Sequence, residues 1–320
     1  MSLAKIIKTI QQHKTFLIST HVNPDADALS SELATALYLK HLKKRVYVIN
    51  ADQVPVRFSF LPSFNLIQNI PQKQTIDYDV AIILDCGDLD RIDRVKALIK
   101  KDKGLINIDH HLTNDLFGKT NYVQPQASST AEVLFDLFKQ AKFSLTKEVA
   151  VLLYLGIMTD TGSFRYDSTT AYTHEVAAEL MKFQFSVSDL YRKLYERVPF
   201  DDLKLFTKVI NRFEKLYNGR VVYIEMRKKT IDRFSAEFDV RDKIFNFLRT
   251  IKGVEVIVIL TEQEPNVTRA NFRSQGEKVN VADLAYFFKG GGHRKASGCM
   301  IPASLSEAKQ KLLSQLEKIL

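Results

Sequence analysis

Aspartates and histidines follow three separate apolar runs in the first half of the chain. The segment HVNPDADAL comes after TFLIST, the aspartates of LDCGD follow DVAIIL, and IDHH ends the run GLINID. A further aspartate lies in MTDTGSF, at the end of an apolar helical pattern. Carboxylate and imidazole ligands without thiolate favour Mn²⁺ or Mg²⁺, with Co²⁺ possible, over structural zinc. These segments therefore predict a divalent-metal centre.

A parallel sheet would bring these polar segments together, because ligands bind at the carboxyl ends of parallel strands, where the loops gather. Five side chains should converge there: His21, Asp25, Asp27, Asp85 and His110. Several carboxylates in one pocket would raise one another's pKa sharply, and a divalent cation holds them ionised together. The number of ligands suits two ions bridged by one carboxylate such as Asp85. Paired ions favour hydrolysis of phosphoesters.

Each segment also has a purely structural interpretation. Asp25 or Asp27 could cap a helix that begins near Ala28, since an N-cap aspartate accepts a backbone hydrogen bond. Asp160 could belong to a turn, and residues 109–111 could be a polar strand end. For each segment alone both interpretations stay open, but the occurrence of all of them together favours the metal centre.

The second half of the chain contains a glycine-rich segment, FKGGGHRKASG, at residues 288–298. Its glycines, among them Gly291 and Gly292, would let backbone N–H groups approach an anion closely, and His293 follows them. Arg273 is expected on a strand, where it could either fork onto a phosphate or be solvated. A hairpin turn is the alternative interpretation of the glycines. We predict that Arg273 and His293 hold a terminal phosphate.

The composition is that of a folded, soluble protein. Of the 320 residues, 45% are hydrophobic and 26% are charged, and the net charge of +9 weakly favours an anionic partner. Two cysteines, Cys86 and Cys299, provide neither a disulfide framework nor C-x-x-C metal spacing. No run of about 18 apolar residues indicates a membrane span, and the first residues do not resemble a signal peptide. We expect a cytoplasmic protein that does not bind a membrane.

The apolar runs that must position the candidate residues alternate with helical patterns. Four runs rich in Ile and Val are typical of strands buried on both faces. They lie at residues 15–20, 45–50, 79–85 and 104–109. This alternation predicts an α/β fold with a parallel sheet and flanking helices. The expected parts are an N-terminal domain at 1–195, a linker helix at 196–219 and a smaller C-terminal α/β domain at 220–320.

Five motifs occur in the order found in the DHH phosphoesterases that carry a C-terminal DHHA1 domain. They are HVNPDADAL, LDCGD, IDHH, MTDTGSF and GGGHRKASG. The resemblance covers nearly the whole chain, and the length and paired domains are most similar to the NrnA branch of that family. It implies that the N-terminal domain is the DHH metal-binding domain and that the C-terminal one, of DHHA1 type, binds substrate.

The resemblance also implies a role for each candidate residue. One metal ion would be held by His21, Asp25 and Asp85. A second ion would be held by Asp27, Asp85, His110 and Asp160. The catalytic residues would be His111, which faces the reacting phosphate, and Asp109. A phosphate away from the scissile bond would be bound by Arg273, Gly291, Gly292 and His293.

The activity implied by the resemblance is hydrolysis of short oligoribonucleotides, including pApA, to mononucleotides, and of 3′-phosphoadenosine-5′-phosphate (pAp) to AMP. It would use two divalent cations, Mn²⁺ in preference to Mg²⁺ or Co²⁺. Closure of the two domains on the substrate and assembly into a homodimer are further expectations. The alternatives are a cyclic di-AMP phosphodiesterase, a manganese pyrophosphatase, a RecJ-type single-strand exonuclease and, in a different class, a catalytically silent nucleotide sensor.

Overall fold

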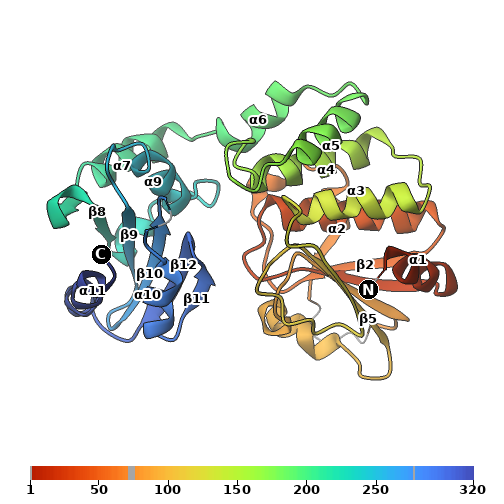
Figure 1. Ribbon diagram of the computed structural model, residues 1–320, viewed down its shortest axis with the longest axis horizontal. Coiled ribbons are helices and arrows are strands. Elements are labelled where there is room, and N and C mark those ends of the chain that lie inside the picture. The colour runs from red at the N-terminus through yellow and green to blue at the C-terminus, as the bar shows by residue number, and fades with distance from the viewer. Residues whose placement is uncertain (1, 71–75, 277) are drawn as a thin grey trace. The chain divides into compact units, whose positions relative to one another are not determined.

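The computed structural model describes residues 2–70, 76–276 and 278–320, and the chain divides into two compact units (Figure 1). The first unit ends at Glu196, and the second comprises Arg197–Leu320. The segment expected to link the domains, 196–219, therefore falls almost entirely within the second unit. Among the described residues, no helix is both long and apolar enough to cross a lipid bilayer.

The first unit is built on a six-stranded parallel sheet with the order β3-β2-β1-β4-β5-β6. Its strands are β1 (Thr15–Ser19), β2 (Arg45–Asn50), β3 (Ile67–Asn69), β4 (Val80–Leu84), β5 (Gly104–Asp109) and β6 (Thr120–Val123). The four apolar runs form the four central strands, which confirms the predicted parallel sheet. The edge strands β3 and β6 escape prediction because they are three and four residues long and lack an apolar run.

Helices and 3₁₀ segments cover both faces of this sheet. They are α1 (Leu3–Gln12), α2 (Ala26–His41), η1 (Val56–Phe58), η2 (Phe64–Leu66), η3 (Leu89–Leu98), α3 (Thr130–Gln140), α4 (Lys147–Asp160), α5 (Ala171–Met181) and α6 (Val187–Tyr195). Ile82 of β4 belongs to the core shared with α1–α5, and Ile83 belongs to the core shared with η3. Because successive strand residues point to opposite faces, β4 is buried on both sides of the sheet.

The second unit has a mixed sheet with the order β11-β12-β10-β9-β8-β7, in which only β8 and β9 pair in parallel among the described strands. Its strands are β7 (Glu214–Leu216), β8 (Val221–Met226), β9 (Val256–Glu264), β10 (Val267–Ser274), β11 (Gly291–His293) and β12 (Ala296–Ile301). Its helical segments are α7 (Phe200–Ile210), η4 (Tyr217–Gly219), α8 (Lys228–Ile231), α9 (Val240–Leu248), α10 (Val281–Phe287) and α11 (Leu305–Ile319). A smaller α/β domain at the C-terminal end is thus confirmed.

Each face of this second sheet has its own apolar core. One core includes side chains of α10 and α11, and the other includes side chains of α7 and α9. The glycine-rich segment forms the hairpin β11–β12, with Arg294 and Lys295 at its turn. The hairpin that was the structural alternative for this segment is therefore present, and it is compatible with an anion-binding role for the glycines.

Candidate metal centre

The three polar segments of the first unit lie at the carboxyl ends of neighbouring strands. His21 follows β1, Asp85 directly follows β4, and His110 directly follows β5. These strands are adjacent, since β1 pairs with β4 and β4 pairs with β5. Three groups of side chains could each hold a metal ion. Within each group, the ligand atoms lie within 4.8 Å of one another. The groups are His21–Asp25–Asp85, Asp85–His110–His111 and Asp27–His110–Asp160.

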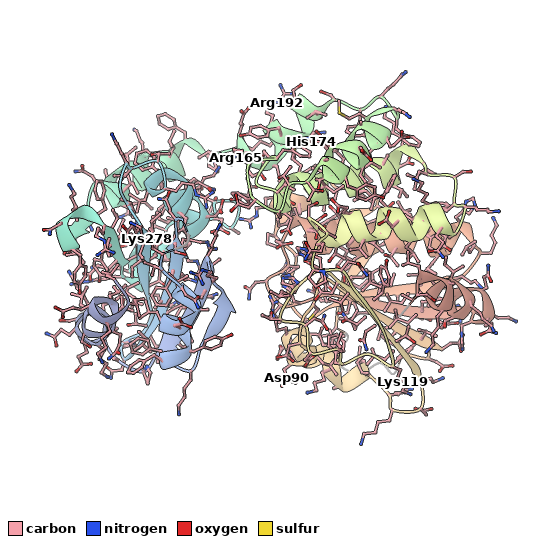
Figure 2. The ribbon with its side chains drawn as sticks, viewed as in Figure 1. Asp90, Lys119, Arg165, His174, Arg192 and Lys278 are labelled. Atoms are coloured by element: carbon pink, nitrogen blue, oxygen red, sulfur yellow. The ribbon has the colours of Figure 1, made fainter. Side chains whose placement is uncertain are left out.

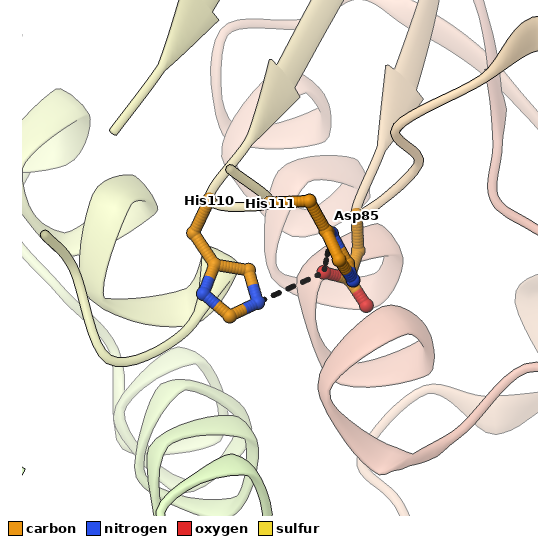
Figure 3. A group of neighbouring side chains, drawn as sticks. All are labelled: Asp85, His110 and His111. Atoms are coloured by element: carbon orange, nitrogen blue, oxygen red, sulfur yellow. Dashed lines mark ion pairs between the residues drawn. The ribbon is translucent and has the colours of Figure 1, made fainter. Parts of the chain in front are cut away.

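Asp85 is the residue at the centre of this arrangement. Its Oδ2 lies 3.7 Å from Nε2 of His21, and its Oδ1 lies 3.7 Å from Nε2 of His110. Oδ1 is also 3.8 Å from Nδ1 of His111, and Figure 3 shows His110 and His111 both facing this oxygen. With His21 near Oδ2, each carboxylate oxygen has an imidazole within 3.8 Å. The backbone of Asp85 is left-handed, with φ of 51°, a conformation that costs free energy for any residue with a Cβ. The turn after β4 thus holds this carboxylate between the other groups.

The orientation of two imidazoles is fixed by backbone carbonyl groups. Nδ1 of His21 lies 2.8 Å from the carbonyl oxygen of Val22, and Nδ1 of His110 lies 3.2 Å from that of Ala127. A carbonyl only accepts, so Nδ1 carries the proton in each ring and Nε2 of the neutral ring offers its lone pair. These Nε2 atoms are the ones that face Asp85. Both rings are therefore oriented as metal ligands are.

Asp27 and Asp160 complete the third group. Nε2 of His110 lies 3.1 Å from Oδ2 of Asp160, which is in the last turn of α4. Burial raises the pKa of Asp27 well above its usual value, and the negative charges of Asp85 and Asp160 raise it further. Burial lowers the pKa of His110, but Asp160 and Asp85 outweigh this effect and raise it.

The charge distribution fits a divalent cation. Burial lowers the pKa of His21, but the neighbouring carboxylates Asp85 and Asp25 raise it to about 8. Burial would raise the pKa of Asp85, yet the three surrounding histidines hold it below its usual range. Protons on Asp27 and the histidines thus compensate the negative charges, and a cation can replace those protons. Oxygen and imidazole donors of this kind suit Mn²⁺, Mg²⁺ or Co²⁺.

His111, a member of the second group, also forms a pair with Asp109. Nδ1 of His111 lies 2.7 Å from Oδ1 of Asp109, whose side chain is fully buried. Burial lowers the pKa of His111, but the hydrogen bond with Asp109 raises it overall. Oδ2 of Asp109 accepts a 2.6 Å hydrogen bond from Asn114, a residue that the sequence analysis missed. The carboxylate is held from both sides and orients the ring of His111.

Asp25 and Asp88 each cap a helical segment. Oδ1 of Asp25 accepts a 3.0 Å hydrogen bond from the backbone N–H of Ala28, so Asp25 is the N-cap of α2 as well as a member of the first group. Asp88 caps η3 through the backbone N–H of Asp90 and belongs to none of the three groups. His174 lies on α5 (Figure 2). Its ring stacks on that of Phe164, with 5.3 Å between the ring centroids.

The N-terminus of α3 is the largest contribution that the sequence analysis missed. The backbone N–H groups of Thr130 and Ala131 donate to the two carboxylate oxygens of Asp27, at 2.8 Å and 3.1 Å. The Thr130 hydroxyl donates to Oδ1 of Asp85 at 2.8 Å. The sequence signal was present, because Ser129 and Glu132 have the S-x-x-E spacing of a helix start. A helix N-terminus stabilises negative charge, and here it stabilises Asp27.

Gly156 allows α4 to pass close to the same carboxylate. A Cβ at this position would lie 2.4 Å from Oδ1 of Asp27 and 2.6 Å from Cβ of Ala131. Both distances are well below van der Waals contact, so no side chain fits between α4 and Asp27. One turn later on α4, Asp160 reaches the same group. The close approach is what brings Asp27 and Asp160 together.

The candidate phosphate-binding residues belong to the second unit. Arg273 lies on β10, where Nη1 donates to the carbonyl oxygen of Phe272 at 3.0 Å and the guanidinium stacks 4.6 Å from the ring centroid of Phe245. Gly291 and Gly292 lie on β11. Gly292 has φ of 136°, and a Cβ there would lie 2.6 Å from the carbonyl oxygen of Ala296. The side chain of His293 lies outside the described part of the structure.

We expect Thr130→Val to weaken divalent-metal binding about tenfold, because loss of a hydrogen bond to a ligating carboxylate typically costs 10- to 100-fold in affinity. Thr130→Ser keeps the hydroxyl and should bind as the wild type does. Calorimetric titration with Mn²⁺ measures both variants. Equal affinity of Thr130→Val and the wild type would show that the hydroxyl of Thr130 does not support Asp85.

Gly156→Ala should disrupt the site without weakening the helix, since alanine is the better helix former. The new Cβ must displace Asp27, and a shift of about 1 Å can lower a rate about a hundredfold. Gly87→Ala is the matched control, because a Cβ there meets its nearest atoms at 3.6 Å. The rate of pAp hydrolysis measures the activity of both variants, and circular dichroism checks that both are folded. Full activity of Gly156→Ala would contradict the importance of this close approach.

Comparison with known proteins supports the geometric interpretation. Residues 15–157 match the model of the DHH family N-terminal domain, and residues 218–320 match that of the DHHA1 domain. The bifunctional oligoribonuclease and PAP phosphatase NrnA of Bacillus subtilis is 30% identical over 98% of this chain and 97% of its own length. The protein of the same name from Thermus thermophilus is 31% identical over 99% of this chain and 93% of its own.

A solved structure with the same fold is also known. The crystal structure of an exopolyphosphatase-related protein from Bacteroides fragilis has a TM-score of 0.90 and 29% sequence identity, and the similarity covers 99% of this chain and 95% of that one. Both family models, the curated relatives and the clustered carboxylates and imidazoles agree. The chain belongs to the DHH family of phosphoesterases that carry a C-terminal DHHA1 domain.

Proposed function

We propose that this protein is a two-metal phosphoesterase that hydrolyses short oligoribonucleotides, including pApA, to mononucleotides and pAp to AMP. The observation that carries the chemistry is the position of Asp85, which belongs to two of the three ligand groups and shares His110 with the third, as a bridging carboxylate would. The substrate class rests on the similarity to the NrnA proteins of Bacillus subtilis and Thermus thermophilus, which extends over nearly the whole chain.

The ligands would divide into two sets around Asp85. In one set His21 and Asp25 join Asp85, and in the other Asp27, His110 and Asp160 join it. When bound, two cations supply Lewis acidity and a water of lowered pKa to the reacting phosphate. Two backbone N–H groups at the N-terminus of α3 fix the orientation of the Asp27 carboxyl group, and the Thr130 hydroxyl fixes that of Asp85. These contacts position the ligands before any substrate binds.

His111 is suited to moving a proton at the reacting phosphate. Asp109 accepts the Nδ1 proton, so Nε2 is the nitrogen that exchanges a proton with the substrate. The carboxylate also stabilises the imidazolium form, which can donate to the departing oxygen. The remaining hydrogen bond of Asp109, from Asn114, keeps the carboxylate from rotating away. The pair therefore acts as an oriented acid beside the metal ligands.

The second unit would bind the phosphate that is not cleaved. Arg273 presents a guanidinium whose plane is supported by the ring of Phe245, and a supported guanidinium can fork onto a phosphate. Gly291, Gly292 and His293 would supply backbone N–H groups and an imidazole. In pAp this phosphate is the 5′ one, because release of AMP requires cleavage of the 3′ phosphate.

A substrate panel tests this proposal. We expect the wild type with Mn²⁺ to release AMP from pAp and pApA and to shorten a short RNA, with little turnover of cyclic di-AMP or pyrophosphate. Preference for cyclic di-AMP or pyrophosphate would overturn the substrate assignment, and silence on all five would favour the nucleotide sensor.

Two variants separate the roles of the two units. Asp85→Ala should abolish hydrolysis, because both ligand sets lose a member. Arg273→Ala should mainly raise KM for pAp, by about 10- to 100-fold, the typical cost of a lost hydrogen bond to a charged group. Arg233→Ala, at an exposed position of the second unit, is the matched control. Substantial activity of Asp85→Ala at saturating Mn²⁺ would contradict the two-metal proposal.

A further inference from the structure

Glu32 of α2 is a buried carboxyl group that the proposed mechanism does not use. Its side chain is fully buried, and it lies five residues after Asp27 on α2, the helix whose N-cap and first turn provide the ligand candidates Asp25 and Asp27. Oε2 accepts a 2.9 Å hydrogen bond from Nδ2 of Asn50, the last residue of β2, which is 1% exposed. This contact joins α2 to the end of a strand that contributes no ligand.

The second oxygens of these two side chains have no partner among the described residues. They are Oε1 of Glu32 and Oδ1 of Asn50, and both are buried. Each is an acceptor when the carboxyl is ionised, and a buried acceptor without a donor is unfavourable. A proton on the carboxyl group would turn one of its oxygens into a donor, and the Asn50 amide oxygen is an acceptor on the side chain already bonded to Glu32. One proton on the carboxyl would thus allow both oxygens to be satisfied in a closed pair of hydrogen bonds.

Exchanging the oxygen and nitrogen of the Asn50 amide leaves the same deficit. The flipped amide would place its oxygen 2.9 Å from Oε2 of Glu32, a contact between two acceptors that also requires a proton on the carboxyl. Burial raises the pKa of Glu32 to about 8, although the Asn50 hydrogen bond and the nearby charge of His21 both oppose this. Among the described groups, His21 is the charged one that acts on Glu32. Protonation near neutral pH agrees with the hydrogen-bond geometry.

The end of β2 also holds the ligand loop itself. The backbone N–H of Asn23, between His21 and Asp25, donates to Oδ2 of Asp52 at 2.6 Å. Asn23 has a left-handed backbone with φ of 52°, which needs such a constraint. The segment 50–52 thus contacts both the loop and the helix that follows it.

We propose that Glu32 and Asn50 form a doubly hydrogen-bonded acid–amide pair that positions α2, and through it Asp25 and Asp27, for metal binding. Glu32 is a positioning residue and touches neither the cation nor the substrate. The pair relies on the ligand roles of Asp25 and Asp27 in the proposed function, but the protonation of Glu32 can be measured without any activity.

Infrared difference spectroscopy tests the protonation directly. The spectrum of the Mn²⁺-loaded wild type minus that of Glu32→Gln should contain the C=O band of a protonated carboxylic acid at neutral pH, and this band should disappear above pH 8. Glu175→Gln, at an exposed position of α5, is the control and should give no such band. A carboxylate band in place of the acid band at neutral pH would show that Glu32 is ionised and would contradict the proposed acid–amide pair.

The pH dependence of stability gives an independent readout with a defined sign. The folded pKa of about 8 lies above the ordinary value of 4.5, so the folded protein binds the extra proton between these values. The contribution of Glu32 is fully present below pH 4.5 and is lost as the pH rises through 8. The metal-free wild type should therefore lose more thermal stability over this range than Glu32→Gln. Identical pH profiles would contradict the proposal.

Metal affinity tests the positioning role. Glu32→Gln replaces the acid by an amide that can form both hydrogen bonds with Asn50, so its Mn²⁺ affinity at neutral pH should stay within about twofold of the wild type. Glu32→Leu cannot bond to Asn50 and should bind Mn²⁺ about tenfold more weakly, as expected for an outer contact of a metal site. A Glu32→Leu variant that folds and binds Mn²⁺ as the wild type does would show that the pair does not position the ligands. A wild-type protein that shows the acid band and binds Mn²⁺ but hydrolyses none of the five substrates would instead count against the proposed function.

Discussion

The electrostatic constraint on which this structure depends is the concentration of carboxylates around Asp85. In a buried position, neighbouring negative charges repel strongly, so they must be neutralised by protons or by a cation. The protein surrounds Asp85 with three imidazoles and gives Asp27 the N-terminus of α3. These arrangements reduce the cost of the crowded charge without removing it. A divalent cation would neutralise the negative charge that remains.

The fold can be understood as the means of bringing those groups together. In a parallel sheet buried on both faces, the carboxyl ends of β1, β4 and β5 lie side by side, and one polar segment follows each strand there. Two helices from later in the chain then complete the cluster, α3 by its N-terminus and α4 by its last turn. The approach of α4 to the cluster requires a glycine at position 156, since any side chain there would collide with the Asp27 carboxylate.

The sequence was informative wherever local chemistry decided the outcome. Continuous Ile and Val runs predicted the four central strands, and the polar residues at their ends predicted which side chains would meet. The roles of Thr130, Gly156 and Asn114 could not be predicted in the same way, because each depends on contacts between segments far apart in sequence. Thr130 contacts a residue 45 positions away, and its neighbour Ala131 contacts one 104 positions away. Nothing in the sequence distinguishes Glu32 from a polar residue on a helix surface, because its burial against Asn50 also depends on a distant segment.

The most direct test of the two-metal interpretation is a count of the ions and of the coupling between them. Electron paramagnetic resonance during titration with Mn²⁺ reports both quantities on the intact protein. The interpretation predicts two Mn²⁺ ions per chain with the exchange-coupled signal of ions that share a bridging carboxylate. A single uncoupled ion per chain, with Asp27, His110 and Asp160 intact, would contradict it.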